Sequence, residues 1–194
     1  MEEMAEAVDT ILQHLKIRRS IFIGHSMGGY VALAFAEAHP DAIKGLCLLN
    51  STARADTIEK QKNRDRAIKI IKTNHKPFIR IAIADLFRPK NRKKFSKEVQ
   101  QAKKEALKTP LQGIVAALEG MKIRNDREVL LHFSPYKKMM IIGKKDPVLT
   151  YPEILEQIIN TEVRLVELPD GHMSTIENFE ETLKAIKSFV KSCN

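Results

Sequence analysis

The chain has 194 residues, of which 43% are hydrophobic and 29% are charged, and its 33 Lys+Arg against 24 Asp+Glu give a formal net charge of +9. This length predicts one domain with room for an insertion, and the composition is that of a soluble globular protein rather than a disordered one. A membrane-spanning protein is excluded, because no apolar run approaches the roughly 18–20 residues that cross a bilayer.

The cysteines and the N-terminal residues indicate a reducing compartment. Cys47 lies in an apolar run and Cys193 one residue from the end of the sequence. Two cysteines are too few for a disulfide scaffold or a four-ligand zinc site. Residues 1–6 are acidic and helical in pattern, without the basic and apolar regions of a secretory signal. We therefore predict a cytoplasmic protein with reduced thiols and no metal site.

Helix and strand patterns alternate over residues 1–52. Apolar residues recur at helical spacing over residues 2–15, and a second helical pattern covers residues 27–38. Continuous apolar runs occupy residues 20–23 and 45–49. Such runs are typical of strands that are buried on both faces, as in a parallel sheet covered by helices.

Residues 53–135 have a different character and predict a helical insertion. We expect about four helices and no strand here, with Phe78 and Phe87 among the apolar residues of one stripe. Between Thr52 and Glu128 the sequence has 21 Lys+Arg and 9 Asp+Glu, a local charge of +12. Two interpretations remain open: solvated helix faces, or attraction of an anionic substrate or membrane surface. Nucleic acid is disfavoured, because no recognition motif accompanies the charge.

The alternation of strand and helix resumes over residues 136–194. Apolar runs at residues 139–142 and 163–168 predict two further strands. A helix is expected after Thr150, and a final helix is expected from about Asn178. The whole pattern predicts an α/β fold with a mostly parallel sheet. Its core comprises residues 1–52 and 136–194, and the helical insertion comprises residues 53–135.

The segment Gly24-His25-Ser26-Met27-Gly28 matches the pattern G-x-S-x-G. It lies between a predicted strand and a predicted helix, where a sharp turn would expose the hydroxyl of Ser26 as a nucleophile. We expect the turn to leave no room for a Cβ atom at Gly24 or Gly28. The alternative is a glycine-rich turn that holds an inert serine.

A serine nucleophile requires a base and an acid that orients the base. Asp146 follows the third predicted strand and His172 the fourth, so both should lie at the same sheet edge as Ser26. The other candidates are weaker: His25 should point elsewhere, and Asp170 suits a turn. The alternative for Asp146 is a role in a turn or a helix cap. The remaining histidines are expected at the surface, and the position after the second strand holds an amide that cannot ionise: His14, His39, His75, His132 and Asn50.

The sequence resembles the α/β-hydrolase superfamily of serine hydrolases, which includes esterases, lipases and lactonases. The resemblance covers essentially the whole chain and rests on Gly24 to Gly29, Gly143 to Asp146, and Gly171-His172. It implies that the helical insertion is a cap domain. Serine rather than aspartate at position 26 argues against epoxide hydrolases and haloalkane dehalogenases.

The resemblance also implies about four strands and a helix before the segment that corresponds to residues 2–15. One of the preceding loops normally supplies the second N–H of the oxyanion hole. Without these strands, residues 21–23 form an apolar edge of the sheet. We expect a second copy of the chain or a complementing N-terminal segment to cover this edge, and an isolated monomer to be poorly soluble or inactive.

The leading hypothesis is a serine hydrolase of a carboxylic ester, lactone or thioester, acting on a small acyl substrate without a cofactor. Ser26 would attack the carbonyl, His172 would transfer the proton, Asp146 would orient the imidazole, and the N–H of Met27 would bind the oxyanion. Phe78 and Phe87 would line the pocket or pack in the core. The alternatives are a carbon–carbon bond hydrolase or lyase on an anionic substrate with the same triad, and a non-catalytic binding module.

Overall fold

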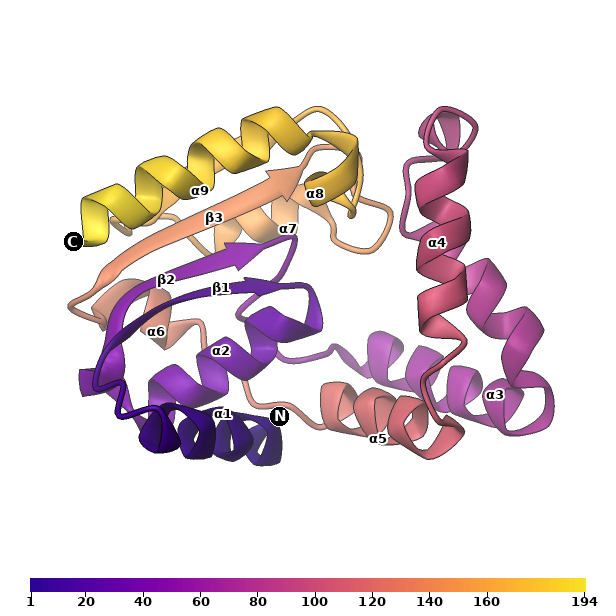
Figure 1. Ribbon diagram of the computed structural model, residues 1–194, viewed down its shortest axis with the longest axis horizontal. Helices are drawn as coiled ribbons and strands as arrows, with labels where there is room; N and C mark the ends of the chain where they lie inside the picture. Colours follow the sequence, from indigo (N-terminus) through magenta and orange to yellow (C-terminus); the bar gives the residue numbers. More distant parts are fainter.

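Four parallel strands form the sheet of the computed structural model, which describes residues 1–194 (Figure 1). In spatial order, which is also sequence order, they are β1 (Ser20–His25), β2 (Ile43–Leu49), β3 (Lys137–Gly143) and β4 (Arg164–Leu168). Cys47 of β2 pairs with Ile23 of β1 and with Met139 of β3. Because every pair is parallel, the carboxyl ends of all four strands meet at one edge. The predicted α/β fold with a parallel sheet is confirmed.

Helices cover both faces of this sheet (Figure 1). One face packs against four helices: α1 (Glu2–His14), α2 (Met27–Ala38), α6 (Val129–Phe133) and α7 (Tyr151–Glu156). The other face packs against α9 (Phe179–Cys193), which follows the short helix α8 (Ser174–Glu177). A single-turn 3-10 helix, η1 (Pro40–Ala42), connects α2 to β2.

The two covered faces explain the continuous apolar runs of the strands. Successive side chains of a strand point to opposite faces. Leu46 and Leu48 of β2 accordingly lie in the core beneath α2, whereas Cys47 and Leu49 lie in the core beneath α9. Burying a large apolar side chain contributes about 1.5–3 kcal/mol. The side chains on both faces of the strand therefore stabilise the fold, which is why both sets of positions hold apolar residues.

Strand β1 forms one edge of the sheet and pairs only with β2. The side chain of Ile23 is 39% exposed at this edge. The prediction that the first strand is an apolar edge strand is therefore confirmed. None of the helices combines the length and the apolar character needed to cross a membrane.

The segment between β2 and β3 contains helices and no strand. Its main elements, in the segment that we call the helical insertion (residues 53–135), are α3 (Ile58–Asp85), the 3-10 helix η2 (Pro89–Asn91), α4 (Ser96–Ala106) and α5 (Leu111–Lys122). Figure 1 shows α3, α4 and α5 beside the sheet, beyond the carboxyl ends of the strands. Any site at that edge of the sheet therefore faces the insertion.

Helix α3 is interrupted near its middle, where Asn74 has non-helical dihedral angles (φ −148°, ψ 64°). Pro77 follows three residues later. Proline is tolerated in the first turn of a helix, because the N–H that it lacks has no helical partner there. The interruption thus allows Pro77 to begin a second helical stretch that runs up to Asp85.

Candidate active site

Ser26 occupies a strained turn between β1 and α2. It is the N-cap residue of α2 and has φ 52° and ψ −120°. A positive φ is uncommon for a residue with a side chain, and such strain costs about 1–3 kcal/mol. The predicted sharp strand-to-helix turn is present, and it directs the hydroxyl of Ser26 to the carboxyl edge of the sheet.

Gly24 and Gly29 are the two glycines at this turn where a Cβ atom would be crowded, whereas the sequence predicted crowding at Gly24 and Gly28. A Cβ atom on Gly24 would lie 2.5 Å from the carbonyl oxygen of Gly28, as predicted. At Gly28 nothing lies within 4 Å of such an atom, so the prediction of crowding there is wrong. Gly28 is in the first turn of α2 and faces open space, whereas Gly29 packs against Ser51, whose Oγ would be 2.3 Å from its Cβ.

We expect Gly29→Ala to destabilise the protein and Gly28→Ala to leave it as stable or slightly more stable. The added methyl at position 29 would displace Ser51, whose hydroxyl donates to the carbonyl oxygen of Ser26 at 2.8 Å. Such overpacking costs about 1–3 kcal/mol, whereas alanine at an open helical position gains about 0.5–1 kcal/mol. Urea denaturation of the two variants measures this difference, and equal stabilities would contradict the assigned packing.

The structure brings Ser26, His172 and Asp146 together in a hydrogen-bonded chain. His172 Nε2 lies 2.9 Å from Ser26 Oγ, and His172 Nδ1 lies 2.8 Å from Asp146 Oδ2. The side chains of His172 and Asp146 are 1% and 0% exposed. The three residues follow β1, β4 and β3, so the predicted meeting of these loops at one sheet edge is observed. The arrangement has the geometry of a nucleophile, a base and an orienting acid.

Asp146 accepts hydrogen bonds on both of its carboxylate oxygens. Its Oδ1 accepts from the backbone N–H groups of Val148 (2.8 Å) and Leu149 (3.0 Å). Its Oδ2 accepts from Asn50 Nδ2 at 3.1 Å, beside His172. From the sequence, Asn50 is recognisable only as a residue unable to act as the acid. In the fold it is a donor that helps to hold the acid in place, and no local sequence signal indicated this contact.

Asp170 does not contact His172 and is not the orienting acid. Its carboxylate accepts from Arg88 Nη1 at 2.8 Å and from Asn178 Nδ2 at 3.1 Å. Burial by itself would raise the pKa of Asp170, but hydrogen bonds from Arg88, Asn91 and Asn178 hold this pKa below its usual value. Asp170 is therefore an ionised partner of Arg88.

His25 lies beside the site. Its Nε2 is 2.9 Å from the backbone carbonyl oxygen of His172, so its side chain is directed to the peptide of His172 rather than to the Ser26 hydroxyl, as expected. Burial lowers the pKa of His25, which favours the neutral imidazole. Its Nε2–H then donates to that carbonyl. His25 thus supports the peptide of His172 and does not contact the hydroxyl of Ser26.

The loop that carries His172 passes closely over the end of β3. A Cβ atom on Gly143 would lie 2.3 Å from the carbonyl oxygen of Gly171 and 2.4 Å from that of Asp170. The amide of Asn50 also donates to the carbonyl oxygen of Gly171, at 3.2 Å. Gly143 therefore lets the loop cross the sheet edge in direct contact with the backbone.

Met27 is the first residue of α2 and directly follows Ser26. Its N–H belongs to the helix terminus that carries the positive end of the helix dipole. From this position the N–H can donate to the negatively charged oxygen that forms when Ser26 Oγ bonds to a carbonyl carbon. The position agrees with the expected role of Met27 and leaves that role as a prediction.

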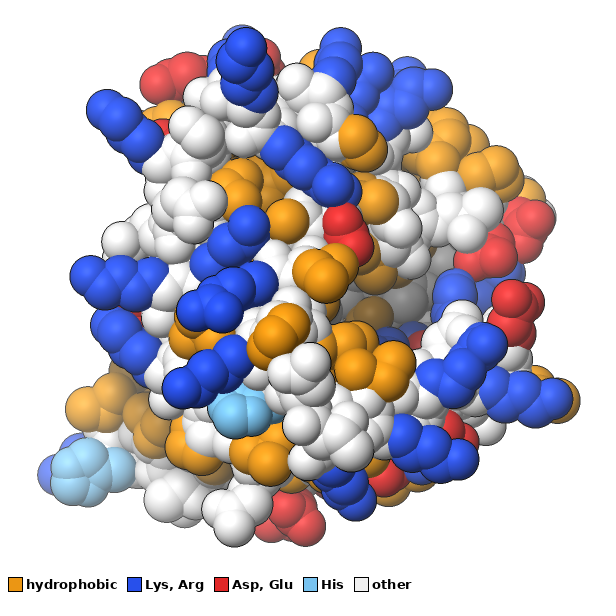
Figure 2. Space-filling model, turned by 90° about the vertical axis from the view of Figure 1, so that its right-hand side faces the viewer, with side chains coloured by type: hydrophobic (Ala, Val, Ile, Leu, Met, Phe, Trp, Pro, Cys, Tyr) orange, Lys and Arg blue, Asp and Glu red, His pale blue; other side chains and the backbone are white.

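Two cavities are lined by residues of the helical insertion. One of about 240 Å³ lies between Arg64 and Arg124 of the insertion and Tyr30, Thr52 and Leu149 of the core. The second, of about 230 Å³, is apolar and lies among α3 and α5, with Phe78 and Leu118 in its wall. Figure 2 shows this side of the molecule hollowed between hydrophobic side chains, with Lys and Arg side chains around the hollow.

Arg124 links the first cavity to the core. Its guanidinium lies 4.0 Å from the centre of the Tyr30 ring and donates to Asp56 Oδ1 at 2.6 Å. Arg64 also pairs with Asp56. Phe87 is fully buried and lines neither of these two cavities.

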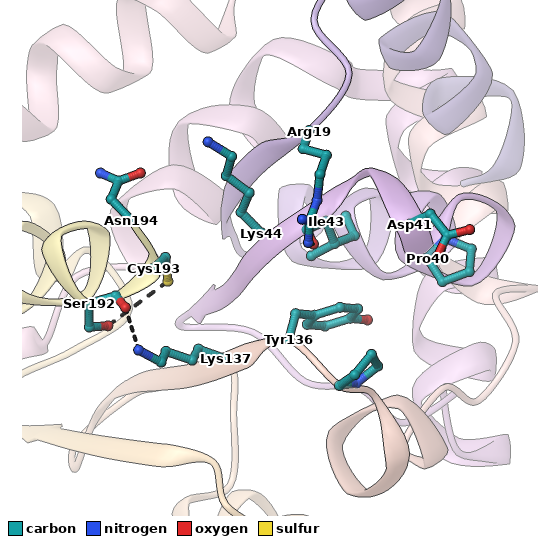
Figure 3. A pocket seen from close by; sticks show the side chains of 11 residues that line it. Arg19, Pro40, Asp41, Ile43, Lys44, Tyr136, Lys137, Ser192, Cys193 and Asn194 are labelled. Carbon is teal, nitrogen blue, oxygen red and sulfur yellow. Dashed lines mark hydrogen bonds between the residues drawn. The ribbon is translucent and has the colours of Figure 1, made fainter.

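A larger cavity lies at the opposite end of the strands. It has a volume of about 640 Å³ and is formed by residues that include Arg19, Lys44, Tyr136 and Lys137 (Figure 3). These residues lie at the amino-terminal ends of β1, β2 and β3. The cavity is therefore separated from Ser26, His172 and Asp146 by the length of the sheet.

Comparison with known proteins supports this description of the fold. A family profile described as alpha/beta hydrolase fold matches residues 1–179. 3-Oxoadipate enol-lactonase 1 of Acinetobacter baylyi is 27% identical over 200 residues, which cover 99% of this chain and 71% of the enol-lactonase.

Two solved structures have the same architecture. A thermophilic esterase from Thermogutta terrifontis, with malate bound, has a TM-score of 0.91 at 27% identity and covers 99% of this chain and 72% of its own. The enol-lactonase from Burkholderia xenovorans LB400 has a TM-score of 0.87 at 23% identity, over 98% of this chain and 72% of its own. The second likeness concerns the fold alone.

Proposed function

Because this chain belongs to the α/β-hydrolase fold family, we propose that it is a serine hydrolase that cleaves carboxylic esters, lactones included, through an acyl-enzyme on Ser26. The observation that carries the proposal is the hydrogen-bonded chain from Ser26 through His172 to Asp146. The names of two relatives, an esterase and an enol-lactonase, support an ester or lactone as the bond that is cleaved.

The first half of the reaction forms the acyl-enzyme. Ser26 Oγ attacks the carbonyl carbon while His172 Nε2 takes the hydroxyl proton, and Asp146 stabilises the imidazolium that results. The N–H of Met27 donates to the oxyanion. The tetrahedral intermediate then collapses, and His172 gives its proton to the leaving alkoxide.

The second half releases the acid. His172 removes a proton from a water molecule, whose oxygen attacks the acyl carbon, and the proton returns to Ser26 Oγ as the carboxylic acid leaves. For a lactone the alkoxide and the acyl group belong to one molecule, so a hydroxy acid is the single product. We propose that residues 53–135 act as a cap that walls the substrate site, with residues 1–52 and 136–194 as the hydrolase core.

Labelling with a fluorophosphonate probe tests the proposed function. We expect a single adduct by intact mass, mapped by peptide mass spectrometry to Ser26 and absent from Ser26→Ala. A screen of esters and lactones of different chain length would then identify the substrate. A folded protein that forms no adduct would overturn the proposal and favour a binding module.

The charge of the helical insertion favours a second candidate function, a reaction on an anionic substrate. This candidate includes the cleavage of a carbon–carbon bond by the same three residues. Exposed basic residues recur at helical spacing along one face of α3, and none of them forms an ion pair: Lys62, Arg66, Lys69 and Lys72. On the face seen in Figure 2, Lys and Arg side chains predominate over Asp and Glu side chains. Such a field attracts anions towards the neighbouring site.

We expect Lys69→Glu/Lys72→Glu to raise KM for an anionic ester about threefold or more at low ionic strength, with less effect as salt is added. KM for a neutral ester should stay unchanged, because a neutral molecule does not respond to the field. Lys187→Glu on α9 is the matched control, since this exposed lysine lies away from the insertion. Equal shifts for both esters would exclude attraction of the substrate as the role of these lysines.

A further inference from the structure

The backbone of His172 is held from two sides by residues distant in sequence. Its N–H donates to the carbonyl oxygen of Leu86 at 3.2 Å, and its carbonyl oxygen accepts from His25 at 2.9 Å. Leu86 is the C-cap residue of α3 and belongs to the helical insertion. The peptide of the proposed base is therefore bonded to the insertion on one side and to the turn of Ser26 on the other.

The side chain of Glu177 adds three hydrogen bonds to this connection between the His172 loop and the insertion. It lies on α8, five residues after His172, and is 6% exposed. Its Oε1 accepts from the backbone N–H of Arg88 at 3.0 Å and from Asn91 Nδ2 at 2.9 Å, both in the insertion. Its Oε2 accepts from the backbone N–H of Met173 at 3.3 Å, next to His172. One carboxylate thus joins the His172 loop to residues 86–91.

The groups around this carboxylate are closely packed. A Cβ atom on Gly171 would lie 2.7 Å from Glu177 Oε2 and 2.8 Å from the N atom of Arg88. The side chain of Arg88 also donates to Asp170 Oδ1 at 2.8 Å and to the carbonyl oxygen of Pro169 at 3.4 Å. Every residue from Pro169 to Met173 therefore contacts, or packs directly against, either residues 86–91 or Glu177.

The chemistry of the contact requires a carboxylate. All three partners of Glu177 are N–H donors, and both oxygens of an ionised carboxylate accept only. A glutamine of the same shape has a single oxygen. Its amide NH₂ would face either the N–H of Met173 or the two donors from the insertion, and a donor facing a donor leaves a buried polar group unpaired.

We propose that Glu177 is a positioning residue whose carboxylate fastens the loop of His172 to residues 86–91, so that the placement of the base depends on the helical insertion. This inference rests on the proposed function, because it assigns to His172 the role of the base. It adds that the insertion acts on the proton-transfer step as well as on the shape of the substrate site. Glu177 does not contact Ser26 or Asp146 and acts through His172 alone.

Labelling and steady-state kinetics of Glu177→Gln test this inference. We expect the rate of fluorophosphonate labelling and kcat to fall by about 10²-fold, because a shift of about 1 Å in a reacting group has an effect of that size. KM should change little, since no substrate contact is lost. The dependence of labelling rate on pH should also shift, because the bond of the imidazole to Asp146 is disturbed. Glu180→Gln, on the exposed start of α9, should match the wild type in all three measurements.

Asn91→Ala is the second variant, for the case in which Glu177→Gln fails to fold. It removes one donor to Glu177 Oε1 and leaves the carboxylate in place. We expect a loss in labelling rate of about threefold to tenfold, the range that one hydrogen bond is worth, with the same shift in pH dependence.

The outcomes separate the two proposals. A wild-type protein that is not labelled would overturn the proposed function itself. A labelled wild type, together with folded Glu177→Gln or Asn91→Ala proteins that keep its labelling rate and pH dependence, would overturn the positioning role. A loss of rate with an unchanged pH dependence and a raised KM would also overturn it, because the insertion would then act on substrate binding.

Discussion

Replacing Ser26 with alanine is expected to lower kcat for an ester substrate by about 10⁶-fold, the loss seen when the nucleophile of such a triad is removed. His172 and Asp146 remain in place, but no hydroxyl is available to form the acyl-enzyme. The positive φ at position 26 is the same strain for alanine as for serine, so the free energy of unfolding should change little. Ester hydrolysis and urea denaturation of the purified variant measure these two effects.

The control for this substitution is Ser188→Ala. Ser188 is exposed on α9 and accepts a hydrogen bond from Arg164, far from the sheet edge that carries Ser26. It should retain the wild-type kcat. Hydrolysis by Ser26→Ala at a rate near that of the wild type would show that another group performs the reaction.

Replacing Asp146 with asparagine is expected to lower kcat by about 10⁴-fold while the fold persists. The side-chain oxygen of the new amide would stay with the N–H groups of Val148 and Leu149, because an NH₂ group cannot accept from them. The NH₂ group then faces His172 Nδ1 and donates to it. Consequently His172 carries its proton on Nε2, which faces Ser26 Oγ and can no longer accept the hydroxyl proton.

Asp41→Asn is a matched control, because Asp41 is exposed at the other end of the strands, beside the large cavity. Its kcat should equal that of the wild type. The pH dependence of kcat in Asp146→Asn should differ from that of the wild type. In the variant the neutral imidazole of His172 carries its proton on Nε2, so loss of a proton from the imidazolium no longer produces the tautomer that can act as the base. An Asp146→Asn enzyme with nearly full activity would contradict the assignment of Asp146 as the orienting acid.

The sequence was sufficient to predict the strands and the meeting of Ser26, His172 and Asp146. Buried strands in a parallel sheet need apolar residues on both faces, and this requirement is visible in a short run of residues such as 45–49. Because parallel strands end at one edge, the residues that follow them are expected to lie together. Local pattern and a simple rule of topology were therefore enough.

The remaining contacts depend on which loops lie against each other, and no local pattern specifies this. Asn50 donates to Asp146, and Glu177 accepts from Arg88, across long stretches of intervening sequence. The environment of Gly28 was mispredicted for the same reason. Whether a glycine is crowded is decided by what packs against it, and at this turn Ser51 packs against Gly29.

The order of the strands sets a distance that the base must span. Ser26 follows β1 and His172 follows β4, and three strand spacings separate these strands, about 14 Å in total. The loop after β4 therefore reaches back across the end of β3, where Gly143 lies beneath it and Gly171 lies within it. Neither glycine touches the serine. Neither position accommodates a Cβ atom unless neighbouring backbone atoms move, so a search for essential residues that considers only reactive groups would overlook both.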